Sequence, residues 1–133
     1  MITAVDTNVL LDILADDPVH ATQSEMLLTR AYQQGSLIIC PVVYAELAPA
    51  ARDRRQLDEW LQRGGIRTVD LTAEHGYAAG SAHAAYRKAG GQRDRLLADF
   101  LIGAHALLEA NRLLTRDRGF YRTYFSGLEI LVA

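Results

Sequence analysis

Short apolar runs that alternate with helically patterned segments are the feature that most constrains the fold of this chain. Five runs have the length of buried strands, and between them apolar residues recur at helical spacing. The expected strands are residues 2–5, 37–40, 66–69, 113–115 and 129–132. Strands that alternate with helices form a parallel sheet covered on both faces. The sequence therefore predicts an α/β protein built as a three-layer α/β/α sandwich.

Capping and helix-breaking residues delimit the expected helices. Thr7 and Asn8 supply N-cap chemistry for a helix from Val9, and Asp17-Pro18 begins a second helix that ends at Gly35. Further helices are expected from Pro41 to a break or kink at Pro49, then through Trp60 to Gly64, over 73–89 after Thr72, and over 95–110 after Asp94, with a short helical or irregular piece over 118–125. No repeat or linker divides them, so residues 1–133 are expected to form one domain.

Composition excludes several classes of protein. No apolar stretch approaches the roughly 18 residues of a membrane span, and Asp6 stands where a signal peptide would be apolar. The single Cys40 leaves no internal disulfide and no thiolate cluster for zinc. The chain is expected in the cytoplasm, with no membrane association.

Four acids lie within or directly after apolar segments: Asp6, Glu46, Asp99 and Asp117. Acids are seldom fully buried without a compensating partner. Sites in open parallel sheets form beyond the carboxyl ends of the strands, where Asp6 and Asp117 are expected. Gly103, four residues after Asp99, leaves a small helix face that could press close to these ends. The four carboxylates can therefore converge on one point.

Each acid also has a simpler interpretation. Asp6 and Asp117 could be turn residues, and Glu46 could face solvent. Asp99 could pair with Arg95, four residues earlier. Other acids, namely Asp12, Asp16 and Asp94, are interpreted as surface or capping residues.

A cluster of hard oxygen ligands without Cys or His favours Mg²⁺ or Mn²⁺ over zinc. Two carboxylates about 4 Å apart repel by roughly 4 kcal/mol at an effective dielectric near 20, and a cation relieves this repulsion. Such ions favour phosphate-containing substrates and can activate water.

The motifs around these acids resemble those of PIN-domain nucleases. They are Asp6-Thr7-Asn8 after the first strand, Glu46 after Pro-Val-Val-Tyr-Ala, Asp99 in Ala-Asp-Phe-Leu-Ile-Gly-Ala-His-Ala, and Thr115-Arg116-Asp117. Their order, spacing and the chain length look most like the VapC toxins of bacterial and archaeal toxin–antitoxin pairs. Two departures, Pro49 and the run Phe100–Gly103, concern helix packing and leave the acids in place.

The resemblance implies a PIN-like sheet in strand order 3-2-1-4-5 and Mg²⁺- or Mn²⁺-dependent hydrolysis of RNA, leaving 5′-phosphate and 3′-hydroxyl ends. By match, the catalytic and metal-binding residues are Asp6, Glu46, Asp99 and Asp117. Thr7, Asn8 and Thr115 are expected to orient these carboxylates or to bind waters.

The expected partners are RNA, an antitoxin and a second copy of the chain. Net charge is −2, yet every basic residue except Lys88 is Arg, which forks onto phosphate oxygens. Arg93, Arg95 and Arg116 are the candidate RNA phosphate contacts, although solvated helix faces remain an alternative. The resemblance implies a VapB-like antitoxin, for which the apolar residues between 9 and 31 offer a groove. It also implies a homodimer.

Three other functions are weighed against this one. A phosphorelay receiver would need an acid pair after the first strand and a Lys near the last strand, whereas the only Lys is Lys88. A haloacid-dehalogenase-type phosphatase would need Asp at position 8, where this chain has Asn8. A catalytically silent PIN-like adaptor that binds RNA or protein is the strongest alternative, but such domains usually lack one or more of the four acids.

Overall fold

The chain folds around a five-stranded parallel sheet with strand order β3-β2-β1-β4-β5. The computed structural model describes residues 1–91 and 96–133. The strands are β1 (Ile2–Val5), β2 (Ser36–Ile39), β3 (Ile66–Thr68), β4 (Arg112–Thr115) and β5 (Glu129–Val132). The predicted α/β class and the strand order implied by the resemblance are both confirmed.

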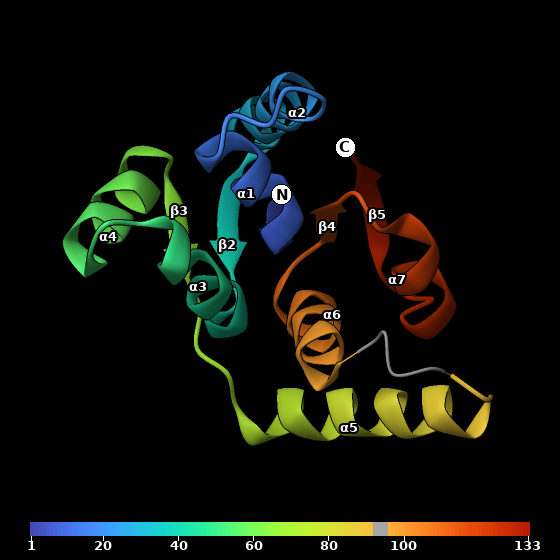
Figure 1. The fold of residues 1–133 in the computed structure, drawn as a ribbon. Helices are drawn as coiled ribbons and strands as arrows, with labels where there is room; N and C mark the ends of the chain where they lie inside the picture. Colours follow the sequence, from blue (N-terminus) through green and yellow to red (C-terminus); the bar gives the residue numbers. More distant parts are fainter. Residues whose placement is uncertain (92–95) are drawn as a thin grey trace.

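Seven α-helices and one 3₁₀ turn connect the strands in the described part of the chain. They are α1 (Thr7–Leu14), α2 (Ala21–Gln34), α3 (Pro41–Leu47), η1 (Ala48–Ala50), α4 (Arg54–Arg63), α5 (Ala73–Lys88), α6 (Leu97–Glu109) and α7 (Arg118–Tyr124). In Figure 1, α5 and α6 lie together on the side of the molecule opposite α2, while α7 lies beside β5. None of the helices in the described ranges is long and apolar enough to cross a membrane.

The order of the strands places a switch point between β1 and β4. From β1 the chain proceeds to β2 on one side, and β4 later pairs with β1 on its other side, with Val5 opposite Leu114. Parallel sheets bind ligands beyond the carboxyl ends of their strands at such a point. The residues that directly follow β1 and β4 therefore lie at the position where a site is expected.

Three helix starts differ from the sequence predictions. The first helix begins at Thr7 instead of Val9, with Asp6 as its N-cap. The second begins at Ala21, three residues after Pro18, because the Asp17 carboxylate accepts the backbone N–H groups of Val19 and His20, both at 2.9 Å, and so closes a separate turn first. The predicted cap Asp94 lies outside the described residues, and α6 starts at Leu97.

The small face of α6 accommodates an aromatic ring. A Cβ placed on Gly103 would lie 2.3 Å from Cε2 of Phe125, at the end of α7. Gly103 was expected to let α6 press against the strand ends, but its closest described neighbour is this ring. The close approach packs α6 tightly against the segment that leads from α7 to β5.

Candidate active site

Asp6 links the end of β1 to the start of α1 and is 5% exposed. Its Oδ1 accepts the backbone N–H of Thr7 at 2.8 Å. Its Oδ2 accepts the Thr115 hydroxyl at 2.7 Å and the Asn8 amide at 3.3 Å. The capping role and the functional role of Asp6 are therefore compatible, because one oxygen caps the helix while the other meets residues from β4 and α1.

Burial raises the pKa of Asp6 above its ordinary value, because desolvation disfavours the charged carboxylate. The hydrogen bonds from Thr115, Thr7 and Tyr121 act in the opposite direction, and the nearby charge of Asp99 raises the pKa further. A buried acid that is supported by donors and faces a second acid is the pattern expected of a functional site.

Tyr121 is the residue that sequence reasoning missed. Its side chain is buried in α7, and its hydroxyl interacts with the Asp6 carboxylate. Burial and then the charges of Asp6, Asp99 and Asp117 raise its pKa. The phenol therefore stays protonated and lies near three of the four predicted acids. Its only sequence signal is its position one helical turn after Asp117, which several neighbouring aromatic residues share at similar spacing.

Glu46 joins this group through Thr7. The Thr7 hydroxyl donates to Glu46 Oε1 at 2.7 Å, while its backbone N–H donates to Asp6. Glu46 lies in the second turn of α3, which follows directly from β2, and it is exposed. Thr7 therefore bridges a buried acid and an acid at the rim.

Asp99 and Asp117 are half-buried. Asp99 lies in the first turn of α6, where its Oδ2 accepts the Leu96 backbone N–H at 3.3 Å and where a negative charge is favoured by the helix dipole. Asp117 is the N-cap residue of α7, and its backbone N–H donates to Thr115 Oγ1 at 2.9 Å. Arg93 and Arg95 lie outside the described residues, and with them the possible pair between Arg95 and Asp99.

Of the four predicted acids only Asp6 is fully buried, because the others lie at helix starts and rims that water can reach. The interpretation of one further acid was wrong. Asp12, interpreted from the sequence as a surface or capping acid, is 4% exposed. It forms a bidentate ion pair with Arg116, at 2.9 Å to Nε and 3.0 Å to Nη2. The amphipathic pattern of α1 gave no sign of this buried partner.

The carboxylate oxygens of the four predicted acids are the kind of ligand that a hard divalent cation prefers. Within residues 1–91 and 96–133, no three His, Cys, Asp or Glu side chains are arranged to hold a metal ion together. Mg²⁺ commonly binds through only one or two carboxylates and keeps several waters. Asp6 and Asp99, whose charges interact, match this number of carboxylates, while Glu46 is linked to Asp6 through Thr7.

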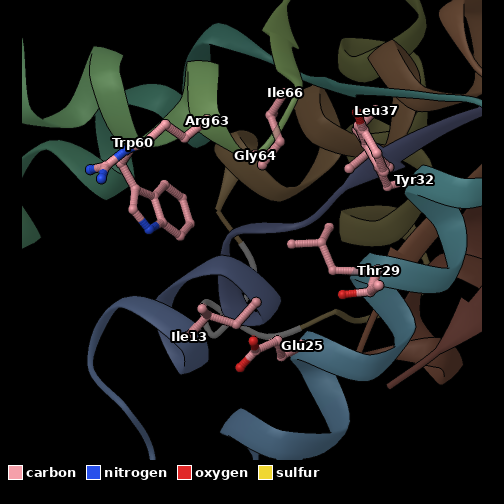
Figure 2. A pocket seen from close by; sticks show the side chains of 10 residues that line it. Ile13, Glu25, Thr29, Tyr32, Leu37, Trp60, Arg63, Gly64 and Ile66 are labelled. Carbon is pink, nitrogen blue, oxygen red and sulfur yellow. The ribbon is translucent and has the colours of Figure 1, made fainter.

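A hollow of about 520 Å³ lies away from the acids, between α1, α2, α4 and β3. Figure 2 shows Trp60 and Arg63 of α4 across from Ile13 of α1 and from Glu25 and Thr29 of α2. Its lining is Ile13, Glu25, Leu28, Thr29, Tyr32, Leu37, Trp60, Arg63, Gly64 and Ile66. Of the residues expected to form a groove over 9–31, four line this hollow together with residues of β2, α4 and β3, while Val9 and Leu10 are buried in the core.

The chain is an α/β protein with carboxylates near the switch point of a parallel sheet, and comparison with known proteins identifies its family. The model of the PIN domain matches residues 3–126. The chain therefore belongs to the PIN-domain family. It is 33% identical over 99 residues to a VapC ribonuclease of Mycobacterium bovis, an alignment that covers 68% of this chain and 69% of the relative.

Solved structures share the fold over the full length of the chain. A VapBC2 structure from Rickettsia felis, bound to a DNA fragment from its promoter, has a TM-score of 0.73 at 20% identity and covers 100% of this chain and 99% of that chain. A VapBC-1 structure from nontypeable Haemophilus influenzae has a TM-score of 0.72 at 20% identity and covers 99% and 98%. These likenesses support the same fold for all described elements.

Proposed function

We propose that this chain is a divalent-metal-dependent endoribonuclease and acts as the toxin of a toxin–antitoxin pair. The observation that carries the proposal is the buried Asp6 at the switch point, close enough to Asp99 for their charges to interact and held by donors from Thr7, Thr115 and Asn8. Family membership and the VapC ribonuclease relative support the choice of RNA as substrate. Residues 1–133 would form one PIN domain that acts in the cytoplasm.

Asp6, Glu46, Asp99 and Asp117 are the proposed catalytic and metal-binding residues. Mg²⁺ or Mn²⁺ held there would supply activation of water and stabilisation of the leaving oxygen of a phosphodiester. Thr115 and Asn8 fix the rotamer of Asp6, and Thr7 holds Asp6 and Glu46 together. Removal of such orienting partners commonly lowers metal affinity or activity by roughly 10- to 100-fold.

Phosphate contacts are proposed for arginines that are close to these acids in the sequence. Arg93 and Arg95 precede the helix that carries Asp99, and the exposed Arg118 and Arg122 follow Asp117 on α7. Arg116, the third residue considered for this role, has two guanidinium nitrogens bound to Asp12.

The test is cleavage of end-labelled RNA by the purified chain with Mg²⁺ or Mn²⁺. Cleavage should stop on chelation, return when metal is added, and leave 5′-phosphate ends. Asp117→Asn should abolish it, and Glu74→Gln, which removes an exposed acid from α5, should not. A folded protein that binds RNA in the presence of metal but never cuts it would instead be the silent adaptor.

The hollow between α1, α2, α4 and β3 is the proposed antitoxin groove. Its Leu28, Leu37 and Ile66 offer an apolar floor for one face of a partner helix or tail, with Glu25 and Arg63 at its border for charged contacts. The solved VapBC structures that share this fold support a VapB-like partner.

Trp60 allows direct observation of this groove, because it is the only Trp in the chain and it lines the hollow. Titration with the product of the adjacent upstream gene should shift Trp60 emission and inhibit RNA cleavage at the same stoichiometry. Leu28→Glu should weaken binding while leaving cleavage by the free chain intact. If the partner inhibits cleavage without changing Trp60 emission, it binds elsewhere. Full inhibition of the Leu28→Glu variant would lead to the same conclusion. A homodimer is also proposed and is tested by the molar mass of the free chain.

A further inference from the structure

Asp12 is a buried acid that the proposed chemistry does not use. It lies on α1, its side chain is 5% exposed, and it receives the Ser24 hydroxyl of α2 at 2.7 Å. Two nitrogens of Arg116 meet its two oxygens at 2.9 and 3.0 Å. This forked geometry requires Arg rather than Lys, because only a guanidinium presents two parallel donors to a carboxylate.

Arg116 stands between two residues of the candidate site. Before it, Thr115 donates to Asp6 and accepts the Asp117 backbone N–H. After it, Asp117 begins α7. The Arg116 backbone N–H donates to Asn8 Oδ1 at 3.2 Å, and the amide of the same Asn8 donates to Asp6. Both the backbone and the side chain of Arg116 are thus attached to α1.

We propose that Asp12 and Arg116 are positioning residues that clamp the turn between β4 and α7, and with it Thr115 and Asp117, onto α1 and α2. The inference rests on the proposed ribonuclease function and deepens it. It also gives Arg116 a role different from a phosphate contact, since two of its three guanidinium nitrogens are bound to a buried carboxylate. The clamp fixes where Thr115 and Asp117 stand relative to Asp6.

Steady-state kinetics separates these two roles for Arg116. Asp12→Asn keeps the shape of the side chain and the positive charge of Arg116 but removes the ion pair. Arg116→Lys keeps the charge but loses the fork. If the clamp positions the site, both variants should lower kcat about 10- to 100-fold, the scale of lost orienting partners, with KM within about twofold of the parent.

The double variant Asp12→Asn/Arg116→Lys should be no slower than the slower of the two single variants, because both changes break one interaction. If Arg116 instead contacts RNA, Asp12→Asn should leave kcat intact and lower KM, and Arg116→Lys should remain near the parent. That outcome would overturn the proposal. Glu59→Gln, which removes the exposed ion pair with Arg55, is the matched control and should change nothing.

Amide hydrogen exchange tests the clamp without relying on an RNA cleavage assay. In Asp12→Asn the amide of Asp117, which is bonded to Thr115, should exchange at least about tenfold faster than in the parent. This acceleration should exceed any acceleration at the core amides of β1 and β2. An equal acceleration at all core amides, with kcat per folded molecule unchanged, would mean that the pair serves stability alone and would refute the clamp. If the parent cleaves no RNA, the proposed function fails, yet this measurement still decides whether Asp12 holds the turn.

Discussion

Asp6 shows that capping a helix and belonging to a site need not be alternatives for one carboxylate. An Asp before a helix is an ordinary N-cap, and this one does cap α1 through Thr7. Its second oxygen meets Thr115 of β4 and Asn8 of α1. At the scale of single residues, a local role therefore does not argue against a functional one, because a carboxylate has two oxygens that can face different neighbours.

The four acids could be proposed from the sequence because each lies within or shortly after an apolar segment. Tyr121 and Asp12 could not be found in this way. Tyr121 is one of several aromatic residues in α7, and only the tertiary packing selects which ring faces Asp6. Asp12 is compatible with an exposed helix position until Arg116, distant in sequence, is brought against it by the pairing of β1 with β4.

The first prediction concerns Asp99. Asp99→Asn should remain folded and lose RNA cleavage by more than about a hundredfold, beyond the range typical of residues that only orient a metal ligand. Without metal its melting temperature should equal or exceed that of the parent, because one of two neighbouring negative charges is gone. Cleavage of labelled RNA and thermal melting are the measurements.

The matched control for Asp99 is Glu74→Gln. Glu74 is also an acid in the first turn of a helix, so its removal costs the same kind of helix-dipole interaction. Glu74→Gln should keep full activity. Retained cleavage by a folded Asp99→Asn protein that is free of contaminating nuclease would remove Asp99 from the proposed site.

At the scale of helices and strands, periodicity and capping residues located all five strands and ordered the helices between them. The boundaries shifted where a side chain competed with the helix backbone, as Asp17 does before α2. The contacts between elements were not accessible from the sequence. A small residue such as Gly103 indicates a close approach, but it does not identify the partner, which here is Phe125.

The second prediction compares two helical glycines. Gly103→Ala should destabilise the fold by about 1–3 kcal/mol, because the new methyl group would overlap the Phe125 ring in a packed core. Gly80→Ala on α5, where a Cβ meets nothing within 4 Å, should stabilise by roughly 0.5–1 kcal/mol through helix propensity. Urea unfolding of both variants measures the contrast. Equal effects from both would contradict the close packing between α6 and Phe125.

The third prediction concerns pH and His105 of α6. This ring is 1% exposed, its Nε2–H donates to the Val69 carbonyl at 2.8 Å, and its Nδ1 has no partner among the described residues. Burial lowers its pKa below 6.5, since desolvation and the neighbouring His75 both disfavour the imidazolium, although Glu109 and the Val69 carbonyl favour it. The folded state therefore binds fewer protons here than the unfolded state does.

It follows that stability from neutral His105 is fully present above about pH 6.5 and is lost as pH falls toward the lowered pKa. His105→Gln can keep a donor to Val69 but does not titrate. Between about pH 7.5 and pH 5, the parent should lose more unfolding free energy than this variant does. Urea titrations at both pH values provide the comparison, and parallel losses in the two proteins would show that His105 is not responsible.

At the scale of the whole molecule, metal binding should be visible as stability. If Mn²⁺ or Mg²⁺ binds only the folded chain, the melting temperature should rise with metal concentration by linkage. At a hundredfold excess over Kd, the free energy of unfolding should increase by about 2.7 kcal/mol. Asp6→Ala should flatten this response, and Glu74→Gln should preserve it. A melting temperature of the parent that is indifferent to millimolar Mn²⁺ would count against any cation site among these acids.

The eight residues of α1 limit which substitutions such a protein can tolerate in evolution. One side of the helix carries Thr7, Asn8 and Asp12, which hold the acidic site, while Ile13 lines the hollow proposed for the partner. A substitution in α1 that frees the protein from its partner therefore risks tilting or loosening the helix that orients Asp6. Variants that escape inhibition and still cut RNA should arise on α4 or β3, for example at Trp60, and rarely on α1.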